Sequence, residues 1–144
     1  MNMKKILLMG ALVLVLWGGV LLGQEVQKPY SYTFDKGVGE CVFTGVSLDQ
    51  VWAVAVKVLL LDKYKIVSTE KPSGSMVAER RGIAGWNCDL SLFFKQRGPD
   101  VCLTSSTYEP PGQQQKGIDD ELRGITEKMF YDKVAELLYS KAEK

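Results

Sequence analysis

The side chains that could carry out chemistry in this 144-residue chain are cysteines and carboxylates, because the sequence contains no histidine. The commonest general base, the usual triad member and the commonest zinc ligand are therefore missing. A cysteine nucleophile needs a neighbouring base, and Cys41, Cys88 and Cys102 also lack the Cys-x-x-Cys spacing of a metal site. We predict no catalytic residue, metal or cofactor. An enzyme that uses carboxylates alone stays open, although no pair is specified.

The spacing of the cysteines limits how they can pair. Residues 86–108 predict a hairpin of two strands, in which Cys102 faces Lys95. Cys88 then lies about seven residues, or roughly 20 Å, away along the ladder. A disulfide needs Cα atoms within roughly 7 Å, which excludes Cys88–Cys102. A disulfide between Cys41 and Cys102 requires the first and last strands to pair, whereas Cys88 is expected in the core.

The charge balance argues against nucleic acid as a partner. The chain has 18 basic and 17 acidic side chains, and without Lys4 and Lys5 this becomes 16 against 17, a net charge of −1. A nucleic-acid-binding domain needs a basic face. Arg80 and Arg81 are either ordinary surface arginines or a contact for a lipid headgroup or a partner. The consecutive acids 119–121 point in different directions on a helix, which indicates a solvated turn.

The N-terminus predicts an export segment. Lys4 and Lys5 precede residues 6–23, which contain no charge over 18 positions. A cleavable signal peptide over 1–23 needs small residues at −3 and −1, and Gly23 at −1 would leave Leu21 at −3. An uncleaved anchor needs about 20 apolar residues. Both alternatives stay open. They place the rest of the chain in the periplasm or at the cell surface, or anchored outside the inner membrane through residues 6–23.

Residues 47–61 predict the buried helix around which the other elements are arranged. Ser47 can cap this helix, and Gln50, three positions further on, completes a capping box. Residues 51–61 contain a single charge, Lys57, and exceed the usual length of a strand. The apolar positions at helical spacing form one face, which consists of Leu48, Val51, Trp52, Ala55, Val58 and Leu59.

The order of the elements predicts an α+β fold. Residues 24–39 indicate a linker or N-terminal extension, in which 30–34 can lay a short strand on the domain. Strands bracketed by helices are typical of a sheet with its helices on one face. We predict a single antiparallel sheet of four to five strands with two helices packed on one face, in the order β-α-β-β-β-β-α, over residues 40–140. The expected strands are 40–46, 65–70, 75–81, 86–95 and 101–108, and the final helix runs from about 119 to 140.

A helix start of Leu-Asp-x-Val-Trp followed by alanine, here Leu48, Asp49, Val51, Trp52 and Ala53, resembles small bacterial envelope proteins and lipoproteins. Their domains pass from a strand through such a helix and a β-meander to a final helix. The layout is also similar to the helix-grip modules of the barrel-assembly lipoprotein C. The resemblance covers about residues 40–138 and implies an envelope domain. It transfers no catalytic residue, and this chain lacks the lipidated cysteine.

We therefore expect an exported bacterial envelope protein that acts as a non-enzymatic binding or scaffolding module. Its partner would be another envelope protein or a lipid. The alternative is a carrier of a small hydrophobic ligand, with a pocket between the 47–61 helix and the sheet. That pocket would be lined by Trp52, Leu59, Leu92 and Phe94.

Overall fold

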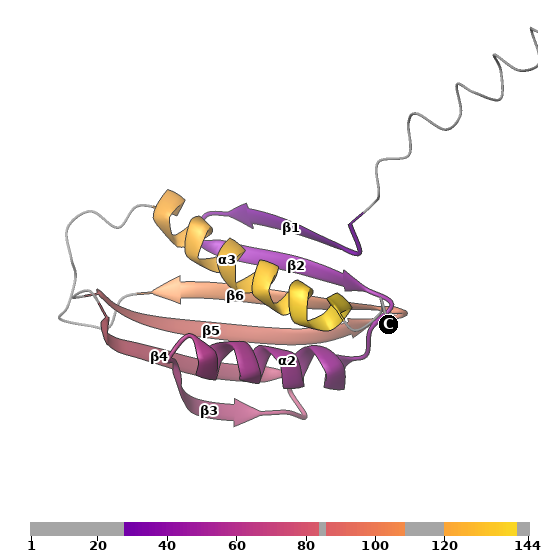
Figure 1. The fold of residues 1–144 in the computed structure, drawn as a ribbon, viewed down its shortest axis with the longest axis horizontal. Coiled ribbons are helices and arrows are strands. Elements are labelled where there is room, and N and C mark those ends of the chain that lie inside the picture. Colours follow the sequence, from indigo (N-terminus) through magenta and orange to yellow (C-terminus); the bar gives the residue numbers. More distant parts are fainter. Residues whose placement is uncertain (1–27, 84–85, 109–119, 141–144) are drawn as a thin grey trace, which may run out of the picture.

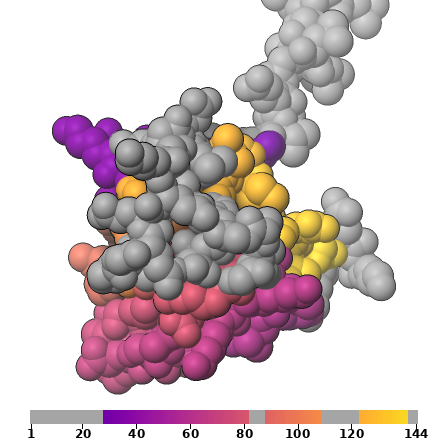
Figure 2. Space-filling model, turned by 90° about the vertical axis from the view of Figure 1, so that its left-hand side faces the viewer, coloured from indigo at the N-terminus to yellow at the C-terminus, as the bar shows by residue number. Residues whose placement is uncertain are grey.

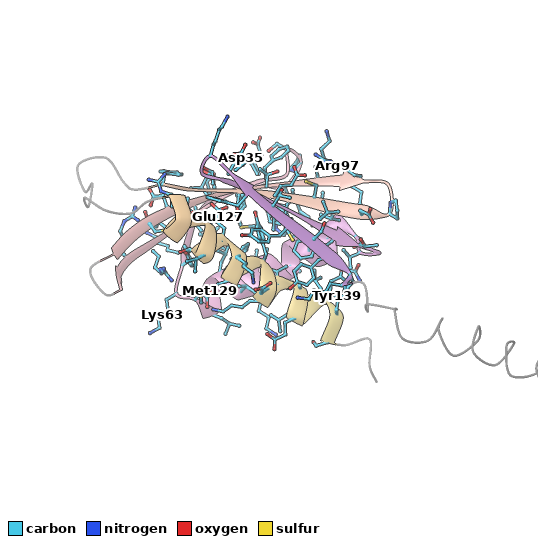
Figure 3. All side chains as sticks on the ribbon, turned by 90° about the horizontal axis from the view of Figure 1, so that it is seen from above. Asp35, Lys63, Arg97, Glu127, Met129 and Tyr139 are labelled. Carbon is cyan, nitrogen blue, oxygen red and sulfur yellow. The ribbon has the colours of Figure 1, made fainter. Side chains whose placement is uncertain are left out.

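The computed structural model describes residues 28–83, 86–108 and 120–140, which form one antiparallel sheet and two helices (Figure 1). The sheet order is β1-β2-β6-β5-β4-β3, so β1 and β3 are the two edge strands and lie at opposite ends of the molecule (Figure 2). Both helices cover the same face (Figure 3). The predicted α+β class is confirmed. The elements are β1 (Tyr30–Asp35), β2 (Val38–Thr44), α2 (Leu48–Leu61), β3 (Lys65–Glu70), β4 (Ser75–Ile83), β5 (Trp86–Arg97), β6 (Asp100–Tyr108) and α3 (Asp120–Tyr139).

The sheet has six strands, so the prediction of four to five is wrong. The additional strand is β1, which lies within the segment 24–39, where we expected a linker that could lay a short strand over 30–34 on the domain. Lys36 and Gly37 join it to β2 with φ angles of 49° and 81°, as in the type I′ turn of a tight hairpin. Lysine rarely adopts a positive φ, so the Lys-Gly dipeptide is a weak turn signal.

The alternation of side chains places one face of the sheet under the helices. Lys95 lies opposite Cys102, so the predicted register of the β5–β6 hairpin is confirmed. Phe93 lies on the other face, which no helix of the described residues covers, and is 46% exposed. The buried core consists largely of Cys41, Phe43, Leu90, Leu92, Phe94, Val101 and Leu103 from the sheet, Val51, Ala55, Val58 and Leu59 from α2, and Phe130, Tyr131, Val134 and Ala135 from α3.

Local hydrogen bonds define both ends of α2. The Ser47 Oγ accepts from the Gln50 N–H at 3.2 Å, and the Gln50 Oε1 accepts from the Ser47 N–H at 2.8 Å, so the predicted capping box is confirmed. At the other end Lys63 has a φ of 62°, and the Tyr64 N–H donates to the Leu59 carbonyl at 2.8 Å. This left-handed turn ends the helix and directs Tyr64 inward.

No helix in the described ranges combines the length and the apolar content that a bilayer span requires. The predicted export segment, residues 1–23, lies outside the described residues. The same is true of Asp119, the first of the three consecutive acids. The choice between a signal peptide and an anchor therefore stays a prediction.

Replacing Lys63 by glycine is expected to stabilise the fold. A side chain in the left-handed region is strained, and glycine removes that strain. We expect Lys63→Gly to raise the free energy of unfolding by about 1 kcal/mol in urea denaturation. Lys57→Gly, at an exposed position inside the same helix, should lower it by about 1 kcal/mol. Destabilisation by both variants would contradict a strained turn.

Candidate functional site

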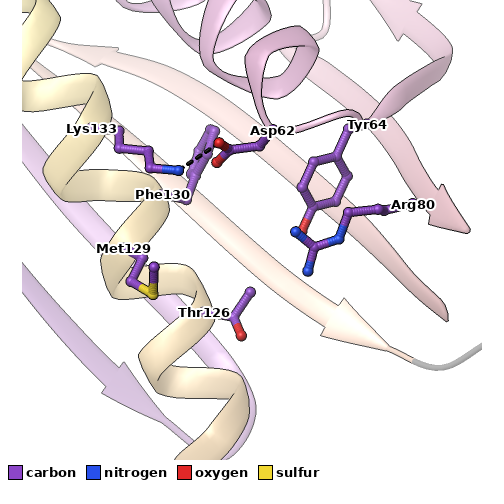
Figure 4. Close-up of a pocket in the computed structure, with 7 residues that line it drawn as sticks. All are labelled: Asp62, Tyr64, Arg80, Thr126, Met129, Phe130 and Lys133. Atoms are coloured by element: carbon purple, nitrogen blue, oxygen red, sulfur yellow. Dashed lines mark hydrogen bonds and ion pairs between the residues drawn. The ribbon is translucent and has the colours of Figure 1, made fainter. Parts of the chain in front are cut away.

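A cleft of about 180 Å³ lies between the C-terminal end of α2, strand β4 and helix α3 (Figure 4). Its lining combines charged groups with apolar and aromatic side chains. The lining residues are Asp62, Tyr64, Arg80, Thr126, Met129, Phe130 and Lys133.

The end of α2 positions residues on one side of the cleft, and α3 positions residues on the other side. The left-handed turn at Lys63 separates Asp62, which caps α2, from Tyr64, which enters the core and is 7% exposed. The α3 residues are spaced i, i+3, i+4 and i+7, so they form one stripe along the helix. This stripe consists of Thr126, Met129, Phe130 and Lys133.

The cleft carries two cations and one carboxylate. The Lys133 Nζ lies 2.5 Å from the Asp62 Oδ1, which pairs one cation with the acid and links α3 to the end of α2. The guanidinium carbon of Arg80 lies 4.9 Å from the centroid of the Tyr64 ring, a cation–π contact. The two cations minus one carboxylate leave the lining with a formal charge of +1.

The chemistry of the cleft favours binding over nucleophilic attack. Burial raises the pKa of Tyr64, so its hydroxyl stays protonated at neutral pH. Burial also raises the pKa of Cys88, whose Sγ lies 3.8 Å from the Tyr64 hydroxyl, so the thiol stays neutral too. Phe130 is buried, whereas Met129 is 55% exposed at the rim. The cleft thus offers cations and apolar contact to a ligand.

A buried polar cluster lies on the other side of α3, facing the sheet. The Ser105 Oγ donates to the Glu127 Oε2 at 2.8 Å, and the Thr107 Oγ1 donates to the Glu127 Oε1 at 2.9 Å. Tyr131, one turn along α3 from Glu127, hydrogen-bonds the Ser105 hydroxyl. Gly39 of β2 leaves room for the carboxylate, because a Cβ there would overlap the Glu127 Oε2 and lie 2.8 Å from the Tyr131 hydroxyl oxygen.

This polar cluster is closed to solvent. Glu127 and Ser105 are each 1% exposed, and Tyr131 is fully buried. Burial raises the pKa of Glu127, while the hydrogen bonds from Ser105 and Thr107 act in the opposite direction. A substrate cannot reach these groups, so we assign the cluster to the positioning of α3 on the sheet.

The sequence pointed to neither group as a whole, and among the residues of the cleft only Arg80 was named beforehand as a possible contact. Glu127 and Tyr131 are four residues apart and share the inner stripe of the final helix, which is a usable signal. Ser105 and Thr107 are two apart and share one face of their strand. Only the pairing of β2 with β6, which sets Gly39 opposite Ser105, brings the cluster together.

The pocket predicted between α2 and the sheet is filled by side chains. Leu59, Leu92 and Phe94 are at most 2% exposed, and Trp52 packs on Phe94 with ring centroids 4.8 Å apart. None of these four residues lines the cleft described above. The prediction placed the pocket on the apolar face of the helix, but the side chains of that face are packed in the core.

The cysteines are free thiols, so the Cys41–Cys102 disulfide that the sequence left possible is not formed. β2 and β6 do pair, but Cys41 faces Leu103 and Cys102 faces Val42. This offset by one residue directs the two thiols to opposite faces of the sheet. Among the described residues no three cysteine, aspartate or glutamate side chains gather as metal ligands.

The two adjacent arginines have different surroundings. Arg80 points to the helix-covered face and lines the cleft. Arg81 points to the other face, where it forms ion pairs with Glu79 at 2.9 Å and Asp89 at 2.6 Å. The predicted contact site at Arg80–Arg81 is therefore divided between two faces of the sheet.

Glu127→Gln should change how stability depends on pH. Because the folded-state pKa of Glu127 is raised above 4.5, its contribution to stability is complete below that pH and is lost as the pH rises through the folded-state pKa. Glutamine keeps the shape but cannot ionise. We expect the melting temperature of the variant to rise relative to that of the wild type as the pH increases above 4.5. Glu136→Gln, at an exposed position of α3, is the control, and an equal pH response of both variants would contradict the assignment.

Gly39→Ala should displace the Glu127 carboxylate from the space that Gly39 leaves for it. The added methyl group meets the Glu127 Oε2 in a packed region, so we expect the free energy of unfolding to fall by about 1–3 kcal/mol. In a Glu127→Ala background the same change should cost less, because the obstructing oxygen is absent. Equal costs in the two backgrounds, measured by urea denaturation, would show that this close contact does not limit position 39.

Comparison with known proteins gives no family for this chain. The sequence matches no known protein family and no curated protein. Among solved structures, the chain is similar to the crystal structure of CalU16 from Micromonospora echinospora, with 10% sequence identity and a TM-score of 0.37 over 78% of this chain and 92% of that one. A likeness of this degree supports no conclusion about function.

Proposed function

We propose that this chain is an exported, non-enzymatic binding module of the bacterial cell envelope, and that the cleft between α2 and α3 is its ligand site. One observation carries the proposal. Arg80 and Lys133 converge with Phe130 and Met129 around a single concave site of about 180 Å³. Charged groups beside apolar walls are typical of ligand sites, in which a few polar groups orient a largely apolar contact.

The lining indicates the kind of ligand. Its formal charge of +1 favours a molecule with one anionic group, which Lys133 or Arg80 can contact. Phe130 and Met129 favour a short apolar or aromatic part. The volume lies below the roughly 300–1,000 Å³ of sites for drug-sized ligands, so the ligand is small.

The export pattern at residues 1–23 supports an envelope location. If the segment is cleaved, the domain is free in the periplasm or at the cell surface. If it is retained, residues 6–23 tether the domain to the membrane. The carrier function that the sequence suggested requires this cleft in place of the filled helix–sheet interface, and the two cations favour an anionic ligand over a purely hydrophobic one.

The proposal is tested with two probes of equal shape, 4-phenylbutyrate and its neutral amide. The protein is purified in the form that an exporting bacterium produces, and binding is measured by titration calorimetry. We expect the acid to bind more tightly than the amide. Lys133→Gln should weaken binding of the acid about tenfold, the effect of about 1.4 kcal/mol, and leave the amide unchanged.

Lys128→Gln is the matched control. Lys128 is also a lysine of α3 that pairs with an aspartate, Asp132 at 2.6 Å, but it does not line the cleft. Its replacement should leave both affinities unchanged. Equal binding of acid and amide, or equal effects of the two lysine variants, would reject the cleft as an anion-binding site.

A further inference from the structure

The two edges of the sheet are built differently. At one edge, the register of β3 with β4 shifts between Ile66 and Ser68, and β3 carries a charged residue at each end. Bulges and charges are the usual devices that keep an edge strand from pairing with another chain. At the other edge, β1 pairs with β2 without a shift over six residues and contains no charge from Tyr30 to Phe34. The β1 edge lacks the bulge of β3 and carries a charge, Asp35, only at the end next to its turn.

The hydrogen-bond pattern shows which backbone groups the β1 edge presents. The Thr44 N–H donates to the Pro29 carbonyl at 2.9 Å, and the register sets these two residues opposite each other. Bonded and non-bonded pairs alternate in an antiparallel ladder, so Ser31 and Thr33 bond to β2. No strand of the described residues occupies the outer edge. The N–H and C=O groups that point to that edge belong to Tyr30, Tyr32 and Phe34.

Contacts with α3 hold this edge in place. The Tyr30 hydroxyl donates to the Asp132 Oδ1 at 2.7 Å. The Tyr32 ring packs on the Tyr131 ring with centroids 5.8 Å apart. Because the strand is held along its length, a partner strand would meet a preformed edge and would cost little ordering entropy on this side.

We propose that β1 pairs with β1 of a second copy of this chain, antiparallel and centred on Tyr32, so that the two sheets become one continuous sheet. In this register Tyr32 faces its own copy and Tyr30 faces Phe34 of the second copy. Each of these pairs exchanges both backbone hydrogen bonds, so every outward group between Tyr30 and Phe34 is satisfied. On the uncovered face Ser31 meets Thr33 of the second copy. Aromatic side chains therefore face aromatic side chains, and hydroxyl side chains face hydroxyl side chains. Both kinds of cross-strand pair favour the association of strands.

The helices leave room for this arrangement. α3 crosses the sheet obliquely (Figure 1): its middle part makes polar contacts with β6 and β1 on either side of β2 and so lies above β2, whereas Gly124 near its N-terminal end lies against Phe34 of β1. With β1 of each copy between them, two β2 strands are three strand spacings apart, or about 14 Å. Packed helices need only about 8–10 Å. The middle parts of the two α3 helices are therefore far enough apart for the second copy to fit.

Disulfide trapping tests both the partner and the register. Ser31→Cys and Thr33→Cys are introduced into separate full-length chains with different tags, which are expressed together, and the cells are treated with diamide. In the proposed register these two positions form a non-hydrogen-bonded pair with Cα atoms about 4.5 Å apart, which suits a disulfide. We expect about tenfold more linked dimer from the mixture than from either variant alone, because like positions are diagonal and about 7–8 Å apart. The native cysteines are buried and do not compete.

The control places the same pair of substitutions on the protected edge, as Ser68→Cys and Glu70→Cys. We expect only background linkage there. Comparable linkage at β3 would attribute the dimer to random collision and overturn the proposal. Linkage of either β1 variant with itself that equals or exceeds linkage in the mixture would overturn the register, and linkage to a different protein alone would overturn the second copy as the partner. If the mixture yields no linked dimer, the pairing through β1 is itself overturned.

Discussion

The burial of the Glu127 carboxylate determines how α3 lies on the sheet. A carboxylate removed from water is costly unless hydrogen bonds replace its hydration. Ser105 and Thr107 supply those bonds from β6, and Gly39 supplies the space from β2. These groups contact Glu127 only when α3 has one position along its axis and one rotation about it. If α3 slid or turned, it would leave a buried acid without partners.

That rotation distributes the remaining side chains of α3 between two flanks. With Glu127 toward the sheet, the helical repeat turns one flank toward α2 and the other toward β1. On the β1 side the helix approaches closely, because a Cβ on Gly124 would lie 2.9 Å from the Phe34 ring. The flank toward α2 carries Thr126, Phe130 and Lys133, and the flank toward β1 carries Gly124 and Asp132.

The proposed ligand site and the proposed pairing edge therefore depend on the same buried contact but lie on opposite sides of α3. The cleft is bounded by Asp62 and Tyr64 at the end of α2, whereas β1 is at the far edge of the sheet (Figures 1 and 4). Pairing through β1 would leave both clefts open. A dimer could thus present two ligand sites on one continuous sheet.

The sequence by itself determined the features that depend on local interactions. The capping box at Ser47 located the start of α2, and the alternation around Lys95 and Cys102 predicted the register of a hairpin with a short loop. A short strand was expected at 30–34 but was not counted in the sheet, because the turn that pairs it with β2, Lys36–Gly37, uses an unusual residue for a positive φ. Helix caps, short hairpins and tight turns depend on interactions between residues that are close in sequence, so the sequence pattern alone can indicate them.

Only the tertiary structure decided the features that join distant segments. The register of β2 on β6, some sixty residues apart in sequence, directs Cys41 and Cys102 to opposite faces and assembles the site around Glu127. The core filled the expected pocket, and a cleft formed where α2 ends against α3. One residue of slip between strands exchanges the two faces, and hydrophobic patterning along a single segment does not specify which residue of a distant strand it will meet.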